Sequence, residues 1–177
     1  MNSVIYIHFL KNNGHLRKNY ILFHPKQKMA QRRIMKELDN LTKNPIENIT
    51  AATVGEDLFH WCAHIQGPAG TPYEGGVFDV DIRFPFDYPL KPPKCSFLTQ
   101  VYHPNVSAKG EICLDILKDA WEPINNIGNV LQQIYFLFLT PNPDNALSSE
   151  IAAQYKSDKA AFEVTAKDWT AKYAQPK

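Results

Sequence analysis

The chain has 177 residues, of which 44% are hydrophobic and 21% are charged, and its formal net charge is +1. These proportions are typical of a globular protein and exclude a wholly disordered or fibrous chain. The length fits one domain with a sizeable core. The longest apolar run, residues 134–139, is far shorter than the ~20 residues of a membrane-spanning helix, so we expect no membrane partner.

Residues 1–28 differ in charge from the rest of the chain. They hold five basic and no acidic side chains, whereas residues 29–177 hold 14 basic and 18 acidic ones. We therefore predict a basic N-terminal extension over residues 1–28 that is disordered or dispensable, and a folded domain over residues 29–177. The extension is also a weak match to an organellar targeting peptide. The slightly acidic domain predicts no binding to nucleic acid, which requires clustered basic side chains.

The sequence pattern predicts one helix and four strands in the first half of the domain. Apolar residues at helical spacing predict an amphipathic helix over residues 30–42, which Asn44-Pro45 ends. Alternating or β-rich runs predict strands over residues 50–54, 58–65, 77–84 and 95–98. Glycine and proline turns between the second and third strands predict an antiparallel meander.

The second half is predicted to be irregular at first and then helical. Ten of the 13 prolines lie between Pro68 and Pro143, and each removes a backbone donor, which favours an ordered but irregular path. Helices are predicted over residues 127–139, 149–155 and 159–173. The first of them is apolar on nearly every side, which predicts a central helix buried by its neighbours. Helix, strands, irregular stretch and helices in this order predict an α+β fold, with one sheet and helices at its ends and on one face.

The three cysteines are the candidate reactive groups, because the sequence lacks the motifs of phosphate-binding loops, dinucleotide-binding sites and serine hydrolases, and lacks histidine pairs at the spacing of zinc ligands. Cys62 and Cys95 lie in predicted strands, where a buried cysteine behaves as a small apolar residue. Cys113 follows a turn and precedes a stretch too interrupted for an ordinary element. Three cysteines cannot all pair and none has metal-ligand spacing, so we expect no metal and a reducing intracellular location.

Short motifs surround Cys113 in a specific order. They are His103-Pro104-Asn105, the segment GEICLD at residues 110–115, and Trp121-Glu122-Pro123. Together with YEGG at residues 73–76, YPLKPP at residues 88–93 and PNP at residues 141–143, this set resembles the ubiquitin-conjugating enzymes, from Met29 to the C-terminus. Within the family the chain looks most like the broad-acting carriers that work with RING and HECT ligases. The resemblance implies the UBC fold: an N-terminal helix, a four-stranded antiparallel meander, a central helix and C-terminal helices.

The resemblance also implies a role for Cys113. This residue would accept ubiquitin from the activating enzyme as a thioester and pass it to a substrate lysine or a ligase cysteine. A thioester suits a carrier, because it keeps a high transfer potential and survives in a site without a hydrolytic base. ATP is consumed by the activating enzyme, so we expect no cofactor on this chain. We expect a cytoplasmic or nuclear location, or both.

Three further residues are matched to the reaction by the resemblance. Asn105 would donate to the oxyanion of the tetrahedral intermediate, hold its loop through side-chain hydrogen bonds, or do both. Asp115 and Asn145 would line the approach to the thioester, and Asn145 stands where close relatives carry Asp. His103 is matched to loop packing rather than to a protease-like dyad with Cys113.

Partner surfaces are matched in the same way. The basic helix face that meets the activating enzyme is matched by Arg32, Arg33 and Lys36, although such a face is also typical of an ordinary solvated surface. The loops that a RING or HECT ligase grips are matched by Leu90, Lys91, Pro123 and Ile124. Relatives usually carry Phe at Leu90 and no charge at Glu122, so the choice of ligase is expected to differ. Thr50 matches a back-face ubiquitin contact of some relatives, or is a plain strand residue.

Three alternatives stay open at this point. The chain could carry another ubiquitin-like modifier, which its basic first helix does not exclude. It could be a catalytically silent ubiquitin-binding variant, although such variants lack the cysteine that is present here as Cys113. A cysteine hydrolase would need a base and an orienting partner beside Cys113, and the sequence offers no credible pair.

Overall fold

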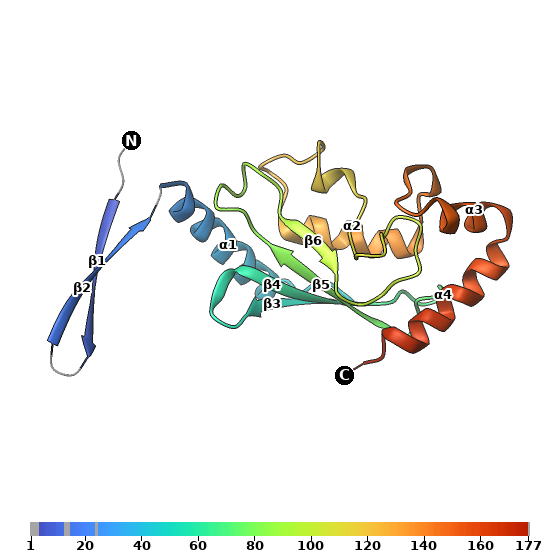
Figure 1. Ribbon diagram of the computed structural model, residues 1–177, viewed down its shortest axis with the longest axis horizontal. Coiled ribbons are helices and arrows are strands. Elements are labelled where there is room, and N and C mark those ends of the chain that lie inside the picture. Colours follow the sequence, from blue (N-terminus) through green and yellow to red (C-terminus); the bar gives the residue numbers. More distant parts are fainter. Residues whose placement is uncertain (1–3, 13–14, 24, 177) are drawn as a thin grey trace.

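The N-terminal part of the chain contains two strands and a helix. The computed structural model describes residues 4–12, 15–23 and 25–176, with side chains from residue 26 onward. Strands β1 (Val4–Asn12) and β2 (His15–Phe23) pair in antiparallel fashion and precede helix α1 (Pro25–Lys43) (Figure 1). The helix begins five residues before the predicted start, because proline suits the first helical position, so our boundary at Met29 falls inside it. That the domain does not need the extension stays a prediction.

One antiparallel sheet forms the centre of the domain. Its strands follow the order β3 (Ile49–Val54), β4 (Asp57–Gln66), β5 (Val77–Arg83) and β6 (Lys94–Phe97). The predicted meander is therefore confirmed, and no predicted strand end differs from the observed one by more than one residue. In β5, Phe78, Val80 and Ile82 are fully buried and the acidic residues between them are partly exposed, as the alternating pattern predicted.

The remaining elements are helical. They are η1 (Asp115–Leu117), α2 (Ile127–Leu139), η2 (Pro143–Asn145), α3 (Ser149–Ser157) and α4 (Lys159–Tyr173). Asn126 begins α2 through a reciprocal capping box with Asn129, and the Asp158 carboxylate caps α4 by accepting a hydrogen bond from the Ala161 N–H. Figure 1 shows α1 at one end of the sheet and α3 with α4 at the other. The predicted α+β architecture is confirmed.

The core lies between the sheet and α2. Trp61 and Phe78 from the sheet are fully buried, as are Leu131 and Ile134 from the helix. The opposite side of α2 is open, since Phe136 is 58% exposed, so the apolar sequence of this helix overstated its burial. In the described part of the chain, no helix has the length and apolar character needed to cross a bilayer.

Candidate active site

The segment before Cys113 is fixed by a tight turn and two short pairings. Gly110 has a φ of +83°, and a Cβ at this position would lie 2.1 Å from the Phe97 carbonyl oxygen, so glycine is required. Single β-bridges then join Glu111 to Ser96 and Ile112 to Val106. The chain is thereby held against β6 on one side and against the loop around residue 105 on the other.

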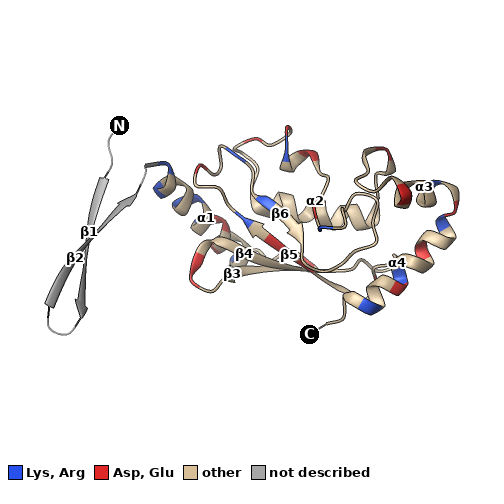
Figure 2. Ribbon diagram, in the orientation of Figure 1, with Lys and Arg blue, Asp and Glu red and all other residues tan. Residues whose placement is uncertain are grey.

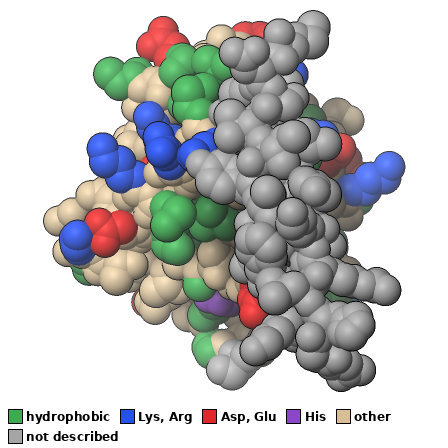
Figure 3. Space-filling model, turned by 90° about the vertical axis from the view of Figure 1, so that its left-hand side faces the viewer, with side chains coloured by type: hydrophobic (Ala, Val, Ile, Leu, Met, Phe, Trp, Pro, Cys, Tyr) green, Lys and Arg blue, Asp and Glu red, His purple; other side chains and the backbone are tan. Residues whose placement is uncertain are grey.

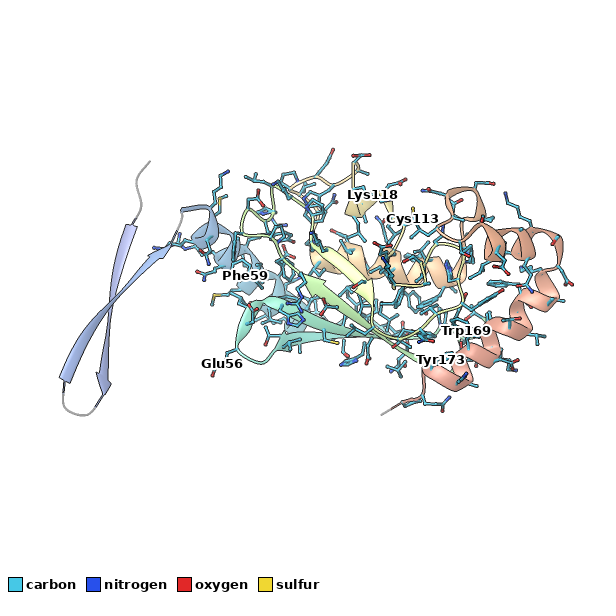
Figure 4. All side chains as sticks on the ribbon, in the orientation of Figure 1. Glu56, Phe59, Cys113, Lys118, Trp169 and Tyr173 are labelled. Atoms are coloured by element: carbon cyan, nitrogen blue, oxygen red, sulfur yellow. The ribbon has the colours of Figure 1, made fainter. Side chains whose placement is uncertain are left out.

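Cys113 lies directly after these pairings. Its backbone N–H donates to the Asn105 carbonyl at 2.9 Å, and η1 begins two residues later. Only 6% of Cys113 is exposed, but its sulfur accepts a hydrogen bond from the Lys118 ammonium group at 3.4 Å, and Lys118 itself is exposed. Figure 4 shows the two side chains next to each other. The sulfur therefore lies just beneath the surface, under a flexible side chain.

Asn105 connects Cys113 to the loop around η2. Its side chain is fully buried, and its amide nitrogen donates to the carbonyls of Asn142 at 2.7 Å and Asn145 at 2.8 Å. Its amide oxygen accepts from the Asn142 N–H at 2.8 Å. Both amide hydrogens are thus engaged, which is the loop-holding role expected from the sequence. The oxyanion role stays a prediction, and it requires one of these hydrogen bonds to open.

His103 is part of the same loop and lies in the core. It is fully buried, its Nε2 donates to the Leu137 carbonyl at 2.9 Å, and its Nδ1 accepts from the Asn105 N–H at 3.0 Å. Burial lowers the pKa of His103 to about 4, against a smaller opposing effect of the Leu137 hydrogen bond. Both ring nitrogens of a neutral imidazole are occupied in this way, so His103 packs the loop and is not a base for Cys113.

The burial of His103 predicts that stability depends on pH. Protonation favours the unfolded chain, because the folded pKa of about 4 lies below the ordinary 6.5. Stability from this residue is therefore complete above pH 6.5 and is lost as the pH falls toward 4, by about 2 kcal/mol between pH 7 and 5. Urea unfolding at both pH values should show this loss in the wild type and a smaller one in His103→Gln. Equal losses in the two proteins would contradict the assignment.

Asp115 and Asn145 are each linked to Cys113 by hydrogen bonds through a third residue, Lys118 for Asp115 and Asn105 for Asn145. Asp115 is exposed and begins η1, where its carbonyl accepts from the N–H groups of Lys118 and Ala120. Asn145 ends η2, with its side chain exposed and its carbonyl bound to Asn105. The structure thus brings both residues to the rim of the site, while their roles in the reaction stay predictions.

The basic face of α1 is only partly free. Lysine and arginine residues gather along the N-terminal half of this helix (Figure 2), and Arg32 and Lys36 are exposed. Arg33 is different, because its guanidinium binds the buried Glu37 carboxylate and donates to the Asn125 carbonyl at 2.8 Å. Two of the three matched residues therefore remain available to a partner, and the third is largely a structural residue.

The two loops matched to ligase binding are exposed and joined to each other. Leu90 is 53% and Ile124 80% exposed, while Lys91 is paired with Asp87 at 3.1 Å. The Trp121 indole N–H donates to the Pro89 carbonyl at 2.8 Å, which ties the loop of residues 85–91 to the loop that contains Pro123. Figure 3 looks onto this end of the molecule and shows apolar side chains next to basic ones.

Two features of the site were missed by the sequence reasoning. Lys118 contacts the Cys113 sulfur through a 3-10 turn that the interrupted pattern after Cys113 did not reveal. Phe86, which is 63% exposed in the same loop as Leu90, was also not identified. An aromatic residue next to a proline-rich turn was the signal available for Phe86.

Thr50 lies exposed on β3, where it borders a hollow that His64 and Tyr173 also line.

Comparisons with known proteins give two findings. The family model described as ubiquitin-conjugating enzyme matches residues 33–170 of the chain. Among solved structures, the chain is similar to the E2 domain of a ubiquitin conjugating enzyme from Toxoplasma gondii. The two are 41% identical with a TM-score of 0.77, and the match covers 82% of this chain and 99% of the other.

Proposed function

The chain belongs to the ubiquitin-conjugating enzyme family, and on that premise we propose that Cys113 accepts the C-terminus of ubiquitin as a thioester and passes it on. In the first step the Cys113 sulfur displaces the thiol of the activating enzyme from the ubiquitin carbonyl. In the second step a substrate amine or a ligase thiol displaces Cys113 in turn. Each step exchanges one acyl bond for another, so neither needs a cofactor on this chain.

The main support for this proposal comes from the groups that surround the Cys113 sulfur. Among the described residues its hydrogen-bond partner is a cation, Lys118, while the nearby His103 is neutral and engaged through both nitrogens. A site without a general base favours a long-lived thioester over its hydrolysis. An ammonium group beside the sulfur also stabilises the negative charge that develops when the sulfur leaves.

The proposal is tested by charging the full chain with ubiquitin. The protein is incubated with activating enzyme, ATP and ubiquitin, and the products are separated with and without a thiol reductant. We expect an adduct that the reductant removes in the wild type, and an adduct of Cys113→Ser that resists the reductant and is cleaved by hydroxylamine. An unchanged adduct in Cys113→Ala would refute the role of this cysteine, and charging by another ubiquitin-like modifier alone would refute ubiquitin as the cargo.

We propose two partner surfaces on the same grounds. Arg32 and Lys36 on α1 would meet the activating enzyme, and the exposed Leu90, Pro123 and Ile124 would meet a RING or HECT ligase. Arg33 would act indirectly, because its contacts with Glu37 and Asn125 join α1 to the loop that contains Pro123. Substrate proteins would approach from the side of η2.

A substitution at Asn145 is expected to change discharge without changing charging. A carboxylate here would attract an incoming ammonium group, because the nearby Asp144 is already paired with Lys156 at 2.6 Å. At this exposed position the gain should be about 0.5–1 kcal/mol, or roughly twofold to fivefold in discharge to low concentrations of free lysine. Single-turnover discharge of Asn145→Asp at low and high salt measures this effect, and Gln175→Glu adds the same charge far from Cys113 as the control. An unchanged rate would contradict the prediction.

A further inference from the structure

Positive charge is concentrated at the start of the chain. Residues 1–36 hold eight basic and no acidic side chains, whereas residues 37–177 hold 11 basic and 18 acidic ones. The net charges of the two parts are therefore +8 and −7. The function proposed above uses only Arg32 and Lys36 of these cations, so the charge that precedes them is left without a role. An asymmetry of this size is typical of a chain whose partner carries a negatively charged surface.

The exposed face of α1 combines cations with apolar side chains. Lys26, Arg32 and Lys36 are exposed along the first turns of the helix. Met29 is 47% and Met35 59% exposed, and both lie among these cations. The five residues share one side of the helix, since positions three and four apart are neighbours. Such a face suits a partner surface that is acidic and also accepts apolar side chains.

Strands β1 and β2 add a second apolar segment next to this helix. Eleven of their 18 residues are hydrophobic and three are basic. The strands form a sheet of their own, which Figure 1 shows beyond the N-terminal end of α1. A two-stranded hairpin is at best marginally stable in water, so it needs a further surface to pack against. Its open edges need water for their backbone groups, which excludes the hydrocarbon interior of a bilayer. The headgroup region meets both needs, because it accepts aromatic and aliphatic side chains and still contains water.

We propose that residues 1–36 bind the surface of a membrane that contains anionic phospholipids. The cations of the strands and of α1 would lie at the lipid headgroups, while apolar side chains reach the boundary of the acyl chains. A nucleic acid would match the charge but would offer little apolar surface to the strands. Binding at the bilayer surface requires no spanning helix. The proposal therefore departs from our expectation of no membrane partner, which rested on the length of the longest apolar run.

Binding to a membrane would leave the candidate active site accessible but would occupy one partner surface. Figure 4 shows Cys113 well away from the N-terminal end of α1. Arg32 and Lys36, in contrast, belong to the surface that we propose for the activating enzyme. The membrane and the activating enzyme would therefore exclude each other on α1, so a carrier at the membrane would have been charged before it bound.

The test measures how much of the full chain sediments with lipid vesicles. The vesicles consist of phosphatidylcholine alone or of phosphatidylcholine mixed with phosphatidylserine, and each kind is used at low and at high salt. We expect binding to the mixed vesicles alone, weakened by salt because ions screen exposed charges. Arg32→Gln combined with Lys36→Gln should weaken binding at low salt by about 25-fold, at about fivefold per cation. Met29→Gln combined with Met35→Gln should weaken it at both salt concentrations.

A matched control removes two exposed cations from α4, at the other end of the sheet. Lys159→Gln combined with Lys167→Gln changes the net charge by the same amount and should leave binding unchanged. Urea unfolding verifies that each variant keeps its folded domain. Equal losses in the two charge variants, unchanged binding of the methionine variant, equal binding to both kinds of vesicle, or no binding at low salt would overturn the proposal. Binding of a DNA duplex without binding of the mixed vesicles would also overturn it, in favour of a nucleic acid. None of these outcomes depends on ubiquitin or on the role of Cys113.

Discussion

Replacement of Asn105 by alanine is expected to slow discharge of charged Cys113 to lysine by about 10²-fold, the cost of losing a single oxyanion donor in comparable sites. It is also expected to lower the free energy of unfolding by about 3 kcal/mol, since the three hydrogen bonds that the buried Asn105 side chain makes with residues 142 and 145 are lost. Charging itself should persist at temperatures where the variant is folded, because Cys113 binds the backbone of residue 105 and not its side chain.

Two measurements separate the roles of Asn105. Urea unfolding reports its hold on the loop around η2, and single-turnover discharge to free lysine reports its contribution to acyl transfer. Asn142→Ala is the matched control, since that side chain accepts from the Asp144 N–H alone and should cost less than about 1 kcal/mol. A large loss of stability with unchanged discharge would show that Asn105 holds the loop and takes no part in the reaction.

Replacement of Glu37 by alanine should produce the largest loss of stability, about 3–5 kcal/mol. Glu37 is 7% exposed, and its carboxylate accepts from the Arg33 guanidinium, from the Tyr88 hydroxyl at 2.8 Å and from the Ile127 N–H at 2.8 Å. Burial and the charge of Glu37 raise the pKa of Tyr88, which keeps its hydroxyl protonated as a donor. Loss of the carboxylate leaves three buried or half-buried donors without an acceptor.

The control for Glu37 lies on the same helix. Asp39 forms an exposed pair with Lys43 at 2.8 Å, and Asp39→Ala should cost less than about 1 kcal/mol. Equilibrium unfolding in urea at pH 7 compares the two variants, with Tyr88→Phe as an intermediate case that removes only one donor. If Glu37→Ala were no less stable than Asp39→Ala, the carboxylate would not be the link that joins α1, the Tyr88 loop and α2.

Much of the fold follows from local pattern in the sequence. The alternation of β5 and the start and end of α2 and α4 were predicted to within a residue or two, because one-sided burial and capping residues leave strong local signals. The start of α1 was missed, since a proline at a first helical position and a proline that breaks a helix look alike without the structure. The open side of α2 was missed because an apolar surface residue looks the same as a core residue.

The candidate site was predicted less completely than the fold. Cys113, Asn105 and His103 were identified through a specific set of motifs, and the structure brings all three together. The contacts of Lys118, Arg33 and Glu37 were not predictable, because each depends on segments that are distant in sequence or on the turn of a short 3-10 helix. A charged residue in a sequence gives no sign of whether it will lie free on the surface or bind a buried partner.

The hydrogen bond from the Trp121 indole to the Pro89 carbonyl has a consequence for recognition. It makes the loops that contain Leu90 and Pro123 a single preorganised platform, so a partner that binds both does not have to order each one separately. Association then costs less conformational entropy, and more of the contact energy appears as affinity. A partner that distorts either loop must also break this bond, which favours partners that match the platform as it stands.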